Sequence, residues 1–95
     1  VAGSIVPLFW CPWSLTWLGL QATKAYDVGD HQRAIAYYTR VIRKDPRAGW
    51  AYYNRGISLL RIGDETAARA DFAMASRLDP KLRAPAAEDL TEDAP

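Results

Sequence analysis

Two stretches of the chain carry the same pattern and decide its fold: YDVGDHQRAIAYYTRVIRKDP (residues 26–46) and LRIGDETAARADFAMASRLDP (residues 60–80). Each stretch has a Gly-Asp pair near its start, continues with small and aromatic residues, and ends in Asp-Pro. The matching positions are offset by 34 residues throughout: Gly29 and Gly63, Asp30 and Asp64, Ala34 and Ala68, Tyr38 and Phe72, Arg43 and Arg77, Asp45 and Asp79, Pro46 and Pro80. A fixed period of this length is the signature of a repeat architecture.

The physical content of each repeat is a helical hairpin. The Gly-Asp pair predicts a tight turn, because glycine adopts positive φ cheaply at a helix end and aspartate can cap the helix that follows. Helices are predicted over residues 31–44 and 65–78, and Asp-Pro ends each one because the residue before proline avoids the helical region. Their inward faces have spacings of four and three: Ala34, Tyr38 and Val41 in the first, and Ala68, Phe72 and Ala75 in the second.

A second set of helices is predicted before each Gly-Asp turn. The later one carries an apolar stripe of Tyr52, Gly56 and Leu59, and the earlier one carries Leu18, Ala22 and Ala25 at the same offsets, which requires helix from about Leu15. Ala22 and Gly56 are the expected points of close contact between the two helices of each hairpin.

In its period, its Gly-Asp turns, its stripe of small and aromatic residues and its Asp-Pro ends, the chain resembles the tetratricopeptide repeat family over residues 15–80. The resemblance implies an all-α fold, an α-solenoid of two antiparallel helix-turn-helix hairpins over residues 15–48 and 49–82. Arg55 stands where the family usually has leucine, which predicts a partly exposed position. Residues 83–95 are predicted to form an acidic tail or a short closing helix rather than a third repeat, because Leu90 stands where a small residue is expected.

The resemblance implies a scaffold for protein–protein interaction that binds a peptide or protein partner in a concave groove lined by the first helix of each hairpin. The groove candidates are Gly19, Thr23, Tyr26 and Asp27 in the first repeat, and Trp50, Tyr53, Asn54, Ile57 and Arg61 in the second. An amide suits a peptide backbone and an arginine suits a carboxylate. For Tyr53 and Ile57 the alternative is packing between repeats, for Asn54 it is hydrogen bonding to neighbouring backbone, and for Arg61 it is a solvated charge. Gly19 and Thr23 replace the Lys and Asn with which one subgroup clamps a C-terminal carboxylate, so a chaperone tail is not an expected ligand.

Residues 1–23 carry no charge. A membrane span is disfavoured, because Pro7 and Pro12 interrupt it and the helix from Leu15 leaves too few residues. Residues 1–14 are therefore interpreted as an apolar lead-in, either a cap over the repeats or the remnant of an export or membrane segment. The alternative function is a scaffold that associates with itself, as a homo-oligomer, or with a membrane through this segment. Localisation stays open: cytoplasmic by default, exported or membrane-associated if residues 1–20 are a signal or anchor remnant.

The sequence gives little support for catalysis, for a metal or cofactor site, or for nucleic-acid binding. The single cysteine, Cys11, excludes an internal disulfide and a cysteine-based zinc site, and His31 is the sole histidine. No nucleophile–base pair and no phosphate-binding loop can be recognised, so neither an enzyme nor a cofactor or metal is expected. Residues 24–83 hold 12 Lys and Arg against 7 acids, and four acids lie in residues 88–93. This basic excess is too mild to predict a nucleic-acid partner.

Overall fold

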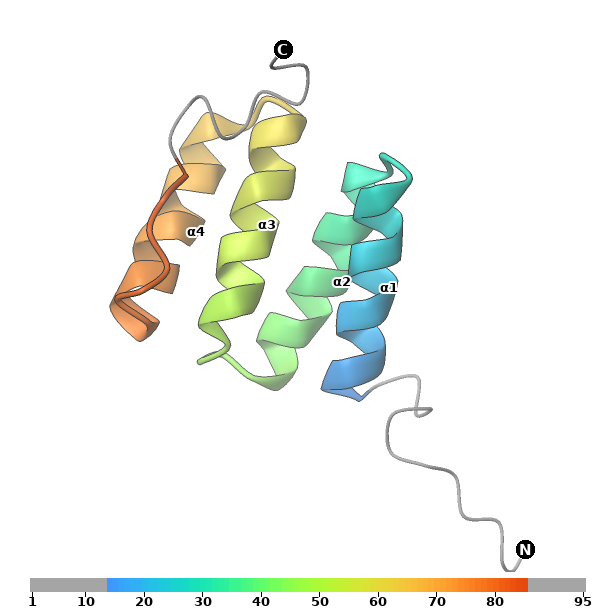
Figure 1. Ribbon diagram of the computed structural model, residues 1–95, viewed down its shortest axis with the longest axis horizontal. Coiled ribbons are helices and arrows are strands. Elements are labelled where there is room, and N and C mark those ends of the chain that lie inside the picture. The colour runs from blue at the N-terminus through green and yellow to red at the C-terminus, as the bar shows by residue number, and fades with distance from the viewer. Residues whose placement is uncertain (1–13, 86–95) are drawn as a thin grey trace, which may run out of the picture.

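The computed structural model describes residues 14–85, which form four helices. They are α1 (Leu15–Asp27), α2 (His31–Lys44), α3 (Gly49–Arg61) and α4 (Glu65–Leu78). Each helix packs antiparallel against the next along the chain, so α1 and α2 make one hairpin and α3 and α4 make the other (Figure 1). The predicted all-α fold is confirmed, and α2 and α4 have the bounds that the repeat predicts.

The Gly-Asp pairs form the turns inside the hairpins. Gly29 and Gly63 have φ of 83° and 89°, a region that residues with a Cβ rarely enter. The carboxylates that follow them are N-caps: Oδ1 of Asp30 accepts a hydrogen bond from the amide of Arg33 at 3.1 Å, and Asp64 does the same for Ala67 at 3.2 Å. Each pair therefore ends one helix and starts the next within three residues.

The core forms where the predicted stripes meet. The two stripes of α2 and α4 are buried in full, as are Leu18, Ala22 and Ala25 of α1. Gly56 allows a close approach of α3 to α4, because a Cβ built on it would lie 2.8 Å from Cε1 of Phe72. In the α3 stripe, Gly56 and Leu59 are buried but Tyr52 is only half-buried, and the guanidinium of Arg55 lies over its ring, 5.7 Å from the centroid.

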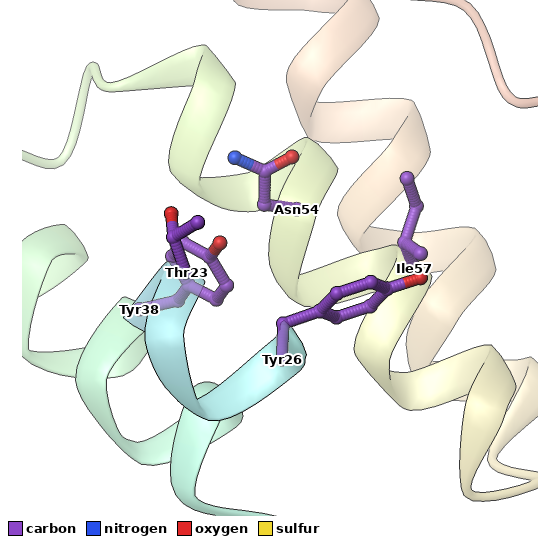
Figure 2. A pocket seen from close by; sticks show the side chains of 5 residues that line it. All are labelled: Thr23, Tyr26, Tyr38, Asn54 and Ile57. Carbon is purple, nitrogen blue, oxygen red and sulfur yellow. The ribbon is translucent and has the colours of Figure 1, made fainter. Parts of the chain in front are cut away.

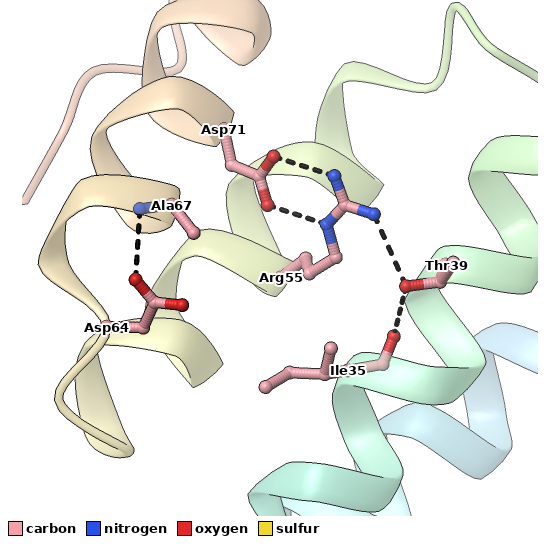
Figure 3. A network of polar contacts seen from close by, with 6 residues as sticks. All are labelled: Ile35, Thr39, Arg55, Asp64, Ala67 and Asp71. Atoms are coloured by element: carbon pink, nitrogen blue, oxygen red, sulfur yellow. Dashed lines mark hydrogen bonds and ion pairs between the residues drawn. The ribbon is translucent and has the colours of Figure 1, made fainter.

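Arg55 ties three helices together (Figure 3). Its Nε and Nη2 donate to the two carboxylate oxygens of Asp71 on α4, at 2.6 and 2.8 Å, and its Nη1 donates to Oγ1 of Thr39 on α2 at 3.3 Å. The Thr39 hydroxyl in turn donates to the carbonyl of Ile35 at 2.7 Å. The hydrogen bonds to Asp71 raise the pKa of Arg55 above its ordinary value, so the guanidinium stays charged. This network joins the two repeats, and the pattern of the sequence did not predict it.

Each end of the described region is held in place by a side-chain hydrogen bond. Ser14 caps α1 by accepting a hydrogen bond from the amide of Trp17 at 3.0 Å. After α4 the chain turns and runs back beside that helix (Figure 1), where Oγ of Ser76 donates to the carbonyl of Leu82 at 2.6 Å. Leu82 also contacts the start of α3, because its Cδ1 lies 3.3 Å from a Cβ built on Gly49. The segment that follows α4 therefore packs beside α4, in the same way that the start of α3, which follows α2, packs beside α2.

Two predictions concern residues outside the described region. Residues 83–85 are not helical, and residues 86–95, on which the choice between an acidic tail and a closing helix depends, are outside it. The lead-in over residues 1–14 is described only at Ser14. No helix within residues 14–85 is long and apolar enough to span a bilayer.

Candidate functional site: a pocket between α1 and α3

The first helices of the two hairpins, α1 and α3, lie next to each other and share a pocket. It has a volume of about 260 Å³ and is lined by Thr23 and Tyr26 of α1, Tyr38 of α2, and Asn54 and Ile57 of α3. Figure 2 shows these five side chains, which come from the three helices. Sites for drug-sized molecules usually run from about 300 to 1,000 Å³. The pocket is therefore of a size that suits one side chain of a larger ligand.

Helical spacing explains how the repeat builds this pocket. Thr23 and Tyr26 are three residues apart, as are Asn54 and Ile57, so each pair lies on one face of its helix. Tyr38 reaches the pocket from the core. Its ring is buried with the α1–α2 cluster, while its hydroxyl end lies among the pocket residues.

The polar groups of the pocket differ in whether they have a hydrogen-bond partner. Thr23 donates from Oγ1 to the carbonyl of Gly19 at 3.0 Å. Burial raises the pKa of Tyr38, so the phenol is neutral and can donate a hydrogen bond. Asn54 is half-buried, and its amide makes no hydrogen bond to any other part of residues 14–85.

Tyr26 is held in place from two sides. Its hydroxyl accepts a hydrogen bond from Nε of Arg61 at 3.2 Å, and its ring packs edge-on against His31 with centroids 5.0 Å apart. In Figure 2 the Tyr26 ring extends from α1 toward Ile57. Tyr26 and Ile57 therefore form a fixed apolar wall between the two repeats.

Comparison with known proteins identifies the repeat. A family model described as Tetratricopeptide repeat matches residues 20–82, which include α2, α3 and α4 and most of α1. The chain belongs to the tetratricopeptide repeat family. No curated protein and no solved structure matched it. Tetratricopeptide repeats generally mediate protein–protein interactions, and the family typically acts as a non-catalytic scaffold.

The nine groove candidates named from the sequence fall in different places. Thr23, Tyr26, Asn54 and Ile57 line the pocket. Arg61 reaches it indirectly through the Tyr26 hydroxyl. Tyr53 packs edge-on against Phe72 with centroids 5.6 Å apart, which places its ring against the core of the second hairpin.

Trp50 lies nearer the start of α3. Its ring atom Cη2 is 3.4 Å from a Cβ built on Gly19, and the ring packs edge-on against Tyr38 at 6.4 Å. It remains 41% exposed. Trp50 lines a second pocket of about 380 Å³ between the two Asp-Pro turns, together with Leu78 and Leu82.

Tyr38 is the pocket residue that the groove prediction missed. The spacing placed it in the core stripe, where it is indeed 4% exposed. The one available signal was chemical, because the matching position in the second repeat is Phe72, which has no hydroxyl. Elsewhere in residues 14–85, no group of three or more His, Cys, Asp or Glu residues is placed to hold a metal ion.

Proposed function

We propose that the pocket between α1 and α3 binds an extended segment of a protein partner. One apolar side chain of that segment enters between Tyr26 and Ile57, and the adjoining peptide group pairs with the amide of Asn54. The observation that carries this proposal is the Asn54 amide, which faces an apolar pocket and has no hydrogen bond within residues 14–85. An amide side chain both donates and accepts, so it matches a peptide group.

The composition of the pocket supports this kind of ligand. Its walls are the rings of Tyr26 and Tyr38 and the side chain of Ile57, while Thr23 and Asn54 supply polar atoms at its rim. Peptide recognition commonly combines main-chain hydrogen bonds with pockets for individual side chains. Sites for drug-sized molecules usually enclose a larger volume than this pocket does.

The fixed surroundings of the pocket favour binding as well. Tyr26 is restrained by Arg61 and His31, and the Arg55 network fixes α3 against α2 and α4. A site whose side chains are already ordered loses less conformational entropy when it binds a ligand. Arg61 therefore contributes by positioning Tyr26.

The experiment selects ligands from a phage library of randomised peptides and measures the Kd of the chosen peptides by calorimetry. Asn54→Ala removes one hydrogen-bonding group and is expected to cost about 1 kcal/mol, roughly fivefold in Kd. Ile57→Ala is expected to weaken binding at least as much, because it removes apolar contact from the pocket wall.

The matched control is Gln32→Ala, an exposed position on α2 outside the pocket. It is expected to leave the Kd unchanged. Helix content measured by circular dichroism should be equal in all variants. The proposal fails if the selected peptides bind Asn54→Ala and Ile57→Ala as tightly as the parent chain.

A further inference from the structure

The outer side of α1 has no neighbouring repeat among residues 14–85. α1 packs against α2 and lies at the end of the array opposite α4 (Figure 1). Its outer stripe consists of Trp17, Gln21, Lys24 and Val28, which follow one another at spacings of four, three and four and so share one side of the helix. Trp17 and Gln21 are half-buried, Lys24 is exposed, and Val28 is 80% exposed.

The second repeat shows what packs on the matching face of α3. The positions 34 residues after the stripe are Ala51, Arg55, Ser58 and Ile62. Arg55 donates a hydrogen bond to Thr39 of α2, and Ala51 and Ser58 are fully buried. A helix, α2, therefore covers this face of α3. The outer stripe of α1 is the corresponding place for a helix on the first repeat.

A pocket of about 250 Å³ lies at this stripe, between α1 and α2. Ala25 and Val28 give it apolar surface, and Lys24 and Arg33 bring cations to it. Asp30 is the one acid in its lining, and it forms an ion pair with Arg33 in which Nε and Oδ2 are 3.5 Å apart. The pocket thus combines an apolar centre with a cationic border.

α2 extends the cationic border. Arg33, Tyr37 and Arg40 follow at spacings of four and three, so they lie on one side of α2. The Tyr37 ring packs edge-on against Trp17 with centroids 6.0 Å apart, which places this side of α2 next to the outer stripe of α1. Arg40 is exposed. We call the combined surface the end face; its residues are Trp17, Gln21, Lys24, Val28, Arg33, Tyr37 and Arg40.

We propose that the end face binds an acidic amphipathic helix of a protein partner, packed on α1 as α2 packs on α3. Charge complementarity selects the sign of the partner, because carboxylates on the flanks of such a helix meet Lys24, Arg33 and Arg40. Its apolar residues contact Trp17 and Val28. This contact goes beyond the peptide pocket, with which the end face shares no residue.

Side-chain size adds a second requirement. Trp17 and Lys24 are bulkier than Ala51 and Ser58, the residues that match them in the second repeat. A helix that approaches α1 as closely as α2 approaches α3 must therefore present small residues such as alanine at the contact.

A second copy of this chain is a poor occupant of the end face. Its α4 corresponds to α2 in the repeat, so α4 would be the helix that packs there. Arg69 and Ala73 of α4 match Ile35 and Thr39 of α2. Arg69 would then approach the cations of the end face, and like charges that meet across an interface oppose binding. The partner is therefore a different protein.

The test measures binding of two synthetic helical peptides to the full chain by fluorescence anisotropy. Both peptides have 14 residues, the length of α2, with alanine and leucine on one face. A lactam bridge keeps them helical, because unconstrained helices this short are marginal in water. One peptide carries glutamate on both flanks and the other carries lysine. The glutamate peptide is expected to bind about tenfold more tightly than the lysine peptide, or better.

Two variants locate the binding on the end face. Lys24→Gln, Arg33→Gln, Arg40→Gln is expected to raise the Kd of the glutamate peptide about tenfold, at roughly twofold for each cation. Val28→Ala is expected to raise it about threefold, because it removes part of the apolar contact. The replaced side chains are exposed, so circular dichroism should show an unchanged fold.

The matched control removes three exposed cations elsewhere, with Arg69→Gln, Arg77→Gln and Lys81→Gln. It lowers the net charge equally and is expected to change the Kd less than about twofold, because distant exposed charges are screened. Equal losses in the two triple variants would mean a diffuse charge effect and overturn the proposal.

Four other results would overturn it as well. They are failure of the glutamate peptide to bind, equal binding of the lysine peptide, an unchanged Kd for Val28→Ala, and a parent dimer in sedimentation velocity that the end-face triple variant dissociates. The last result would assign the end face to a second copy of the chain.

Discussion

Replacing Arg55 with leucine tests what holds the two repeats together. The substitution leaves Asp71 with a side chain only 8% exposed and without its bidentate partner. Breaking a buried ion pair by removing one partner typically costs about 3–5 kcal/mol. Because the Arg55 side chain is 22% exposed, water can partly replace it, and we expect a loss of about 3 kcal/mol in the free energy of unfolding.

That loss is large for a domain of this size. At about 0.1 kcal/mol per residue, the described region has a stability of roughly 7 kcal/mol. The assay is urea unfolding followed by far-ultraviolet circular dichroism, with the slope m compared between variants to confirm that the unfolding transition has the same character. Arg55→Leu should lower the midpoint by about 2 M if m is near 1.5 kcal/mol per molar.

The double variant Arg55→Leu, Asp71→Ala separates the ion pair from simple packing. It removes the buried charge along with its partner, so its stability should return to within about 1 kcal/mol of the parent. The reasoning is refuted if Arg55→Leu unfolds within about 0.5 kcal/mol of the parent chain, or if the double variant loses the sum of the two single losses.

Three further substitutions probe the fold and the pocket. Gly56→Ala places a Cβ 2.8 Å from the Phe72 ring, so urea unfolding should show a loss of about 1–3 kcal/mol; an unchanged midpoint would mean that the ring moves freely. Asp64→Ala removes the N-cap of α4 and should cost about 1 kcal/mol, whereas a loss below about 0.3 kcal/mol would exclude a capping role. Tyr38→Phe removes the buried pocket hydroxyl. Because the second repeat has Phe72 at the matching position, thermal melting should change little. The Kd of a pocket-binding peptide should rise about fivefold if that hydroxyl bonds to the ligand. An unchanged Kd would remove the hydroxyl from the site.

The features that the sequence predicted correctly are those determined by residues close together in the chain. The limits of α2 and α4 follow from an aspartate cap at one end and Asp-Pro at the other. Their buried faces follow from helical spacing, and the close approach at Gly56 follows from the absence of a side chain. Each of these signals is contained within one helix and its flanking turns, so the two matching repeats were enough to find them.

The features that were not predicted depend on contacts between helices. Arg55 and Asp71 are 16 residues apart on different helices, and no spacing rule pairs them. Arg55 was predicted to be partly exposed, which its 22% exposed side chain supports, but its partners could not be read from the pattern. The return of the chain beside α4 rests on Ser76 and Leu82, neither of which belongs to a turn or core motif.

The pocket also shows that the spacing of residues does not predict contacts between helices. Family spacing directed attention to a face of α1 and α3 on which Tyr26, Asn54 and Ile57 line a pocket. It did not separate Tyr53, whose ring packs on Phe72, from its neighbour Asn54, whose amide faces the pocket. Adjacent residues on a helix differ by about 100° in direction, and only the packed structure fixes which of them meets the core.

The peptide-binding proposal is tested most directly by titrating ¹⁵N-labelled protein with a phage-selected peptide and recording amide spectra. The side-chain amide of Asn54 and the backbone amides of Thr23 and Ile57 should shift together and saturate at one Kd. The exposed outer positions of α4, such as Arg69 and Ala73, should not move. Saturable shifts confined to α2 and α4, with the Asn54 side chain unchanged, would contradict the account and place the binding surface on the opposite face.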